Sequence, residues 1–141
     1  MGSIHFFVED VQFKLSGPRK ISHWIKQSIT SEGKKLGGLN FVFCSDDYLL
    51  RMNQEYLNHK TLTDIITFDN SEEEGTIGGD IFISVDRVRE NSVSFQSGFD
   101  RELHRVMIHG VLHLVGYSDK NTRDKAVMRG KEDAYLSLQR K

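Results

Sequence analysis

Two histidines and a carboxylate occur in this sequence at a spacing that could hold a metal ion. His109 and His113 are four residues apart, so on a helix they share one face, one turn from each other. Asp119 follows just past Gly116, where we expect the helix to end, and a turning chain could bring its carboxylate back toward the imidazoles. Such a set binds a divalent metal and leaves a position open for a further ligand.

The spacing alone leaves a second interpretation open. Either histidine could be a core imidazole bonded to a carbonyl oxygen, and Asp119 could cap the next helix. The apolar setting strengthens the case for a metal, because buried imidazoles without partners cost about 1–3 kcal/mol each and a shared ion satisfies both. The pattern of residues still leaves both interpretations open. The apolar residues around the pair are Val106, Met107, Ile108, Val111, Leu112, Leu114 and Val115.

Residues 109–119, HGVLHLVGYSD, resemble the signature of the YbeY family of bacterial rRNA-maturation endoribonucleases, H-G-x-L-H-L-x-G-Y-D-H. Other segments similar to the family occur in the same order, and the resemblance spans about residues 40 to 135. The signature is specific, whereas the other segments would be weak alone. These segments are 57–58 with 63–68, then 79–84, then Met128 and Glu132.

The sequence departs from the family at the third ligand. Asp119 stands where the family usually has a histidine, and Ser118 stands where it has an aspartate. A carboxylate is a harder and more anionic ligand than an imidazole, so the identity of the metal stays open. The resemblance implies one divalent transition metal per chain, with zinc as the first expectation and nickel or another metal as alternatives.

A second departure concerns RNA contacts. The family usually has an arginine after a tyrosine in the segment before Thr-Asp, and here Leu57 follows Tyr56. If that arginine holds RNA phosphate, another cation must replace it. Arg51, His59 and Lys60 are the nearby candidates.

The resemblance implies a metal-dependent endoribonuclease specific for single strands, acting in maturation of small-subunit (16S) rRNA. Its partners would be single-stranded rRNA, the small ribosomal subunit and the subunit's assembly proteins. Glu132 is either a hydrogen-bond acceptor for a ligand histidine or a surface acid. The alternatives are a non-catalytic assembly factor with a structural metal, and a metallohydrolase with another substrate. Zinc proteases have a glutamate base where this chain has Gly110, which disfavours peptide hydrolysis.

Composition indicates a single globular domain over residues 1–141. The net charge is −1 and the pI is about 6.6, so there is no global basic field for nucleic acid. Cys44 is the only cysteine, which excludes an internal disulfide, and we expect it to be buried. No stretch resembles a membrane span or a signal peptide, so we expect a cytoplasmic protein.

Hydrophobic periodicity predicts an α+β domain, with a small mixed sheet of about four strands and about five helices. The metal-binding helix lies in the C-terminal third, capped by Asp100, and His104 points about 140° away from His109 on it. Asp86 is expected to cap the preceding helix, and Gly37-Gly38 to form a turn. We expect strands at 3–9, 39–44, 64–68 and 77–85 and helices at 18–31, 45–57, 86–96, 101–115 and 122–138, the last packed by Val127, Met128, Ala134, Tyr135 and Leu138.

Overall fold

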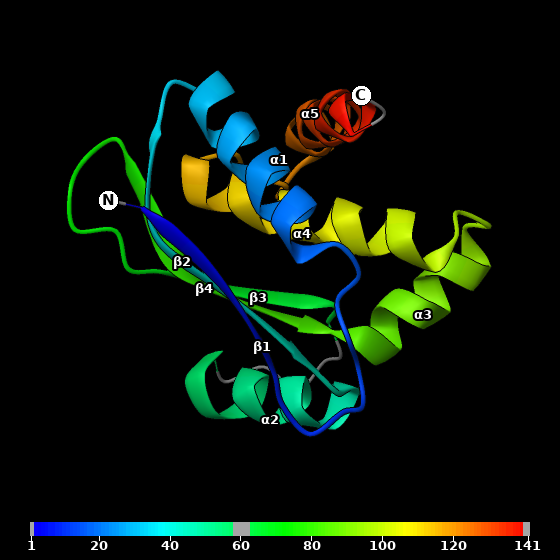
Figure 1. The fold of residues 1–141 in the computed structure, drawn as a ribbon. Helices are drawn as coiled ribbons and strands as arrows, with labels where there is room; N and C mark the ends of the chain where they lie inside the picture. The colour runs from blue at the N-terminus through cyan, green and yellow to red at the C-terminus, as the bar shows by residue number, and fades with distance from the viewer. Residues whose placement is uncertain (1, 58–62, 140–141) are drawn as a thin grey trace.

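A mixed four-stranded sheet in the order β1-β2-β4-β3 forms the centre of the molecule (Figure 1). The computed structural model describes residues 2–57 and 63–139. β1 and β4 both run parallel to β2, and β3 runs antiparallel to β4, so the predicted α+β class is confirmed. The strands are β1 (Ser3–Val8), β2 (Lys35–Cys44), β3 (Ile65–Asp69) and β4 (Thr76–Ser84), and the helices are α1 (Pro18–Ser31), α2 (Asp46–Leu57), α3 (Val85–Ser94), α4 (Phe99–Val115) and α5 (Thr122–Leu138).

Helices cover the two faces of the sheet unequally (Figure 1). α1 and α4 pack on one face, over the fully buried Phe41, Phe43 and Ile81, and α5 packs on α4. The alternate residues of the same strands point to the other face, where α2 covers Cys44 and Phe82. Burial raises the pKa of the Cys44 thiol to about 12, as expected for a buried and unreactive cysteine. No helix within the described ranges has both the length and the apolarity needed to cross a membrane.

Gly110 allows α4 to lie close against the sheet. A Cβ atom at this position would be 2.8 Å from Cδ1 of Ile65 and 3.0 Å from Cγ2 of Ile81. The position that holds the general base in zinc proteases is therefore inside the core of this protein. A side chain there would point at β3 and β4, not at the histidines.

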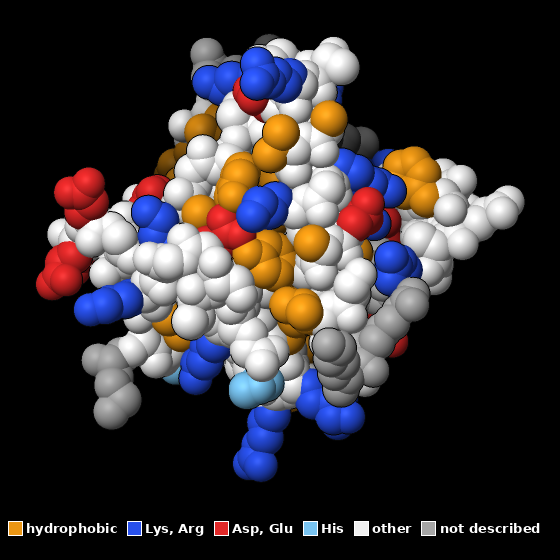
Figure 2. Space-filling view, turned by 90° about the horizontal axis from the view of Figure 1, so that it is seen from above, with side chains coloured by type: hydrophobic (Ala, Val, Ile, Leu, Met, Phe, Trp, Pro, Cys, Tyr) orange, Lys and Arg blue, Asp and Glu red, His pale blue; other side chains and the backbone are white. Residues whose placement is uncertain are grey.

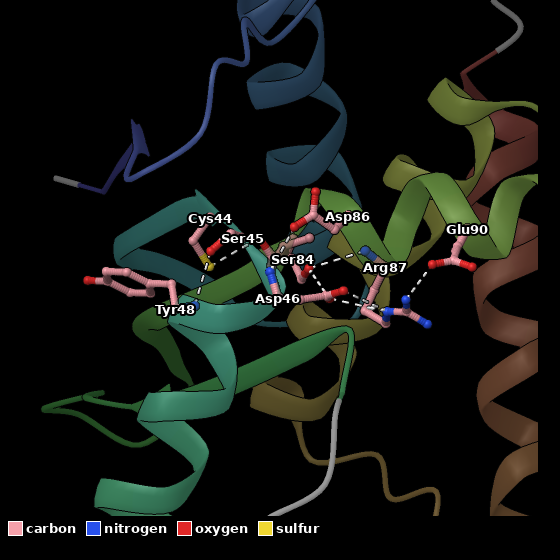
Figure 3. A network of polar contacts seen from close by, with 9 residues as sticks. Cys44, Ser45, Asp46, Tyr48, Ser84, Asp86, Arg87 and Glu90 are labelled. Carbon is pink, nitrogen blue, oxygen red and sulfur yellow. Dashed lines mark hydrogen bonds and ion pairs between the residues drawn. The ribbon is translucent and has the colours of Figure 1, made fainter.

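A polar network joins the start of α2 to the start of α3 (Figure 3). The Ser84 hydroxyl accepts from the Arg87 amide at 3.2 Å and donates to Asp46 at 2.7 Å. The predicted cap at Asp86 is therefore wrong, because Ser84 caps α3. The Asp86 carboxylate instead accepts from the Asp46 amide at 3.0 Å, at the start of α2.

The predicted turn at Gly37-Gly38 is also wrong. β2 begins at Lys35 and passes through both glycines, and its register with β4 shifts between Leu36 and Leu39. A Cβ at Gly37 would be 2.9 Å from Cγ2 of Thr76. The glycines therefore permit an irregularity inside a strand, which sequence pattern does not distinguish from a turn.

Two expectations for the C-terminal helices need correction. Gly98 precedes α4, so Asp100 lies within the first turn of α4 and is not its cap. In α5, Met128 and Tyr135 are buried as predicted. The buried face of the helix is narrower than expected, and it includes Leu136, which was not predicted. The predictions that were wrong are Val127, Ala134 and Leu138, which are exposed.

Candidate metal centre

α4 presents two imidazoles on one side near its C-terminal end. The ring centroids of His109 and His113 are 4.7 Å apart and their planes cross at 75°. Gly116 ends the helix with a φ of 128°, a conformation that other residues rarely adopt. The Tyr117 amide donates to the carbonyl of Leu112 at 3.0 Å, which reverses the chain and starts it back along the histidines.

The returning chain places the Asp119 carboxylate beside both rings. Its Oδ2 atom is 3.3 Å from Nε2 of His109 and 3.5 Å from Nε2 of His113. One potential ligand atom from each of the three residues lies within 4.8 Å of the others. Asn121 caps α5, since its side chain accepts from the Asp124 amide at 2.8 Å, so Asp119 is not needed as a cap.

Glu132 approaches the other ring nitrogen of His109. Its Oε2 atom is 2.6 Å from Nδ1, and the residue is only 4% exposed. A carboxylate at Nδ1 fixes the tautomer, because Nδ1 then donates its proton and Nε2 keeps a lone pair. Arg105 in turn donates to Glu132 at 2.9 Å and to Asp133 at 2.6 Å. This network orients His109 with Nε2 toward Asp119.

The carboxylates around His109 determine its proton affinity. Burial acts to lower the pKa of His109, but the hydrogen bond with Glu132 and the charges of Glu132, Asp119 and Asp64 outweigh it, so the pKa is raised. For Asp64, burial is the largest influence and raises the pKa of its carboxyl, against the opposing charge of His109. The centre thus concentrates negative charge, which a bound cation would offset.

His104 lies away from these residues, as its position on the helix predicted. Its Nδ1 atom is 3.3 Å from Oε1 of Gln139, and its ring contacts Trp24 on α1.

Of the residues expected to contact RNA, the structure describes Arg51, which does not lie at the metal centre. Arg51 lies on α2, across the sheet from α4, with its guanidinium carbon 5.9 Å from the centroid of the Tyr48 ring. His59 and Lys60 lie outside the described residues. A role in RNA binding stays a prediction for all three.

Three side chains near the centre were missed by sequence reasoning. A cleft of about 420 Å³ beside His109 is lined by Asp64, Glu102 and Arg105 among others. The sequence could have indicated Arg105, because this residue precedes His109 by one helical turn and therefore lies on the same face of the helix. Asp64 lies in a segment that resembles the family, but nothing local shows that β3 carries it to α4.

The donor set fits a divalent transition metal. Two imidazole nitrogens and a carboxylate oxygen provide protein ligands and leave a position for water or substrate. His113 and Asp119 keep side-chain exposures of 29% and 40%, so a substrate could reach the ion. The carboxylate partner of His109 completes the arrangement that ligand histidines usually show.

Comparison with known proteins gives consistent similarities. Residues 7–139 match the family model of endoribonuclease YbeY. The protein of that name from Cytophaga hutchinsonii is 51% identical over 138 residues, covering 98% of this chain and 96% of its own. That from Porphyromonas gingivalis W83 is 42% identical over 140 residues, covering 99% and 92%. The solution structure of a Thermotoga maritima protein aligns with a TM-score of 0.67 and 28% identity, over 97% of this chain and 89% of that one.

Proposed function

The chain belongs to the YbeY family and is an endoribonuclease, and we propose that it cuts single-stranded RNA with a divalent metal held by His109, His113 and Asp119. The observation that carries this proposal is the convergence of both Nε2 atoms on one carboxylate oxygen of Asp119, at 3.3 and 3.5 Å. The donors come from α4 and from the turn after it, and Gly116 makes that turn possible.

A metal in this centre would polarise a phosphoryl oxygen and lower the pKa of a bound water. The residues of the chain supply orientation and charge balance. Glu132 holds His109 in the tautomer that keeps Nε2 free, and Arg105 offsets part of the negative charge of Glu132 and Asp133. Gly110 removes the base that a zinc protease would use, which supports phosphodiester over peptide hydrolysis.

We expect zinc in this centre, since two imidazoles with one carboxylate are a ligand set that zinc accepts, and nickel is the second choice. We further propose small-subunit 16S rRNA as the substrate, met in the cytoplasm together with the small ribosomal subunit and its assembly proteins. The similarity to the named endoribonucleases supports RNA as the substrate class. The particular RNA is an inference from the family.

A non-catalytic assembly factor is the second candidate. Two departures from the family favour it. Asp119 replaces a histidine ligand of the metal, and Leu57 replaces an arginine that could hold RNA phosphate, so both functions on which cleavage would depend are altered. It predicts RNA binding that persists without turnover.

Cleavage of a labelled RNA with one single-stranded and one duplex half tests the proposal. We expect zinc-loaded protein to cut only the single-stranded half. His113→Ala should abolish cutting, while His23→Ala, an exposed histidine on α1, should leave the rate unchanged. Binding of the RNA without any cutting by the wild type would favour the assembly factor instead.

A further inference from the structure

The cleft beside the metal centre has the dimensions and the lining of a nucleotide site. It holds about 420 Å³ and reaches from His109 on α4 to Phe95 at the end of α3 and to Lys125 and Arg129 on α5. α4 packs against both α5 and α3, so the cleft lies where these three helices meet. It is continuous with the metal centre, because Asp119 also lines it.

Glu102 is the first sign that the cleft binds something. This residue is 5% exposed and lines the cleft, yet its carboxyl forms no hydrogen bond or ion pair with any residue in the described ranges. Burial raises the pKa of this carboxyl, despite the nearby charge of Arg105. Within the described residues, Ser97 Oγ is the one fully buried side-chain polar atom without a hydrogen bond, so the Glu102 oxygens still reach the space of the cleft. A ligand in the cleft that donates a hydrogen bond would give this carboxyl the partner that it lacks.

Phe95 is the second sign. It follows α3 with its amide bonded to the carbonyl of Asn91 at 2.9 Å, so its backbone is fixed while its side chain is 64% exposed. An exposed aromatic ring at the wall of a cleft offers a face on which a nucleobase can stack.

Lys125 and Arg129 supply positive charge at the α5 rim. They are four residues apart and therefore on the same face of the helix. Both are exposed, and neither forms an ion pair within the part of the chain that the structure describes. Such cations suit RNA phosphates, which the carboxylates of Asp64 and Asp119 would repel from the interior of the cleft.

Basic and acidic side chains lie intermixed on one face of the molecule. Figure 2 shows Lys and Arg side chains interspersed with Asp and Glu side chains on the face seen from above, with hydrophobic side chains between them. A strand of RNA would therefore be held by particular side chains and not by a continuous basic field.

We propose that this cleft binds the nucleotide next to the cut phosphodiester, with its base stacked on Phe95 and its exocyclic amino group donating to Glu102. Lys125 and Arg129 hold the backbone of the same strand. The inference rests on the proposed RNA cleavage and adds a base preference to it. Cytosine, adenine and guanine carry an exocyclic amino group and uracil does not, so the site discriminates against uracil.

The test uses zinc-loaded protein and oligouridine RNA with a single cytidine, compared with oligouridine alone. We expect cleavage beside the cytidine to be at least about fivefold faster than at the matching uridine, as a hydrogen bond to a carboxylate would give. In Glu102→Gln the amide both donates and accepts, so the cytidine-to-uridine ratio should fall toward one. This variant keeps the size of the side chain, and its metal content should match that of the wild type.

The other contacts have their own readouts. Phe95→Ala should raise KM at least about fivefold, since stacking on an aromatic ring is lost, and Phe95→Trp should restore it. Phe7→Ala, a half-exposed aromatic on β1, is the matched control and should leave KM unchanged. Lys125→Ala should reduce the salt dependence of kcat/KM by roughly 0.7 in the log–log slope, whereas Lys26→Ala on α1 should not.

The failures of the two proposals can be told apart. If the wild type cuts cytidine and uridine sites equally and Phe95→Ala keeps its KM, while His113→Ala abolishes cutting, the nucleotide site is wrong and the nuclease stands. If the wild type cuts no RNA with any added metal, both proposals are overturned.

Discussion

The Glu132 carboxylate lies 2.6 Å from Nδ1 of His109, although the two residues are 23 positions apart in the sequence. This contact links α5 to α4 at the candidate metal centre, and Arg105 extends it through a 2.9 Å bond to the same carboxylate. The centre is therefore more than a pattern on one helix. It depends on how α5 packs, and its properties should change when that contact is altered.

Substitution of Glu132 should weaken metal binding although Glu132 is not a proposed ligand. Because Glu132→Gln loses the charged partner of His109 and of Arg105, we expect zinc affinity to fall by about 10- to 100-fold. Competition with a chelating dye would measure it. Glu90→Gln is the control and should keep the wild-type zinc affinity, since Glu90 pairs with Arg87 on α3, outside the network around His109. Equal affinity in Glu132→Gln and wild type would show that this contact has no role in metal binding.

Substitution of two helical glycines should have opposite effects on stability. Gly110→Ala would place a Cβ 2.8 Å from Ile65, so we expect a loss of about 1–3 kcal/mol in the free energy of unfolding. Gly130→Ala on α5 meets no atom within 4 Å and should gain about 0.5–1 kcal/mol, because alanine favours the helix. Urea denaturation measures both. A neutral Gly110→Ala would mean that α4 can move away from the sheet without cost.

Stability at acid pH should depend on Glu32. Tyr117 donates to it at 2.6 Å and Lys131 at 3.1 Å, and Tyr135 also bonds to it. Burial acts to raise the pKa of this carboxyl, but these hydrogen bonds and the Lys131 charge outweigh it and hold the pKa below its ordinary value of 4.5. The unfolded chain therefore binds the proton more readily, so the stabilisation is complete above about pH 4.5 and is lost as the pH falls through the folded-state pKa.

Glu32→Gln removes that charge. We expect the free energy of unfolding of this variant to be about 1–2 kcal/mol lower than that of wild type at pH 7. This difference should shrink below pH 4.5. Thermal unfolding of both proteins between pH 3 and 7 would measure this difference. Glu72→Gln in the exposed loop before β4 is the control and should match wild type throughout. A difference that stayed constant with pH would contradict the ionised role of Glu32.

The sequence predicted the elements of the centre where the signal was local. The four-residue spacing of His109 and His113 and the helix stop at Gly116 indicated Asp119 as a residue that a turn could bring to the imidazoles, and its Oδ2 atom lies 3.3 Å from Nε2 of His109. The same holds for α5, whose bounds were predicted as 122–138 and observed there. These features depend on neighbours within a few residues, which periodicity and capping describe well.

Features made by distant segments were not predictable in this way. Glu102 and Asp64 belong to α4 and to the start of β3, and only the packing of α4 across β3 brings them to one cleft. The cap of α3 was assigned to Asp86, because the sequence alone does not show that the start of α2 takes this carboxylate. Glu32 lacked a signal for the same reason, since its partners come from the end of α4 and from α5.

The most direct measurement is the metal content of the purified protein, by plasma mass spectrometry, for wild type, His113→Ala, Asp119→Ala and His23→Ala. We expect about one equivalent of a transition metal in wild type and in the His23→Ala control, and its loss in the other two variants, because each of them removes one of the three proposed ligands. Metal that persists in Asp119→Ala would mean that another residue is the third ligand. No metal in the wild type, even after reconstitution with zinc, nickel or manganese, would contradict the metal-dependent nuclease.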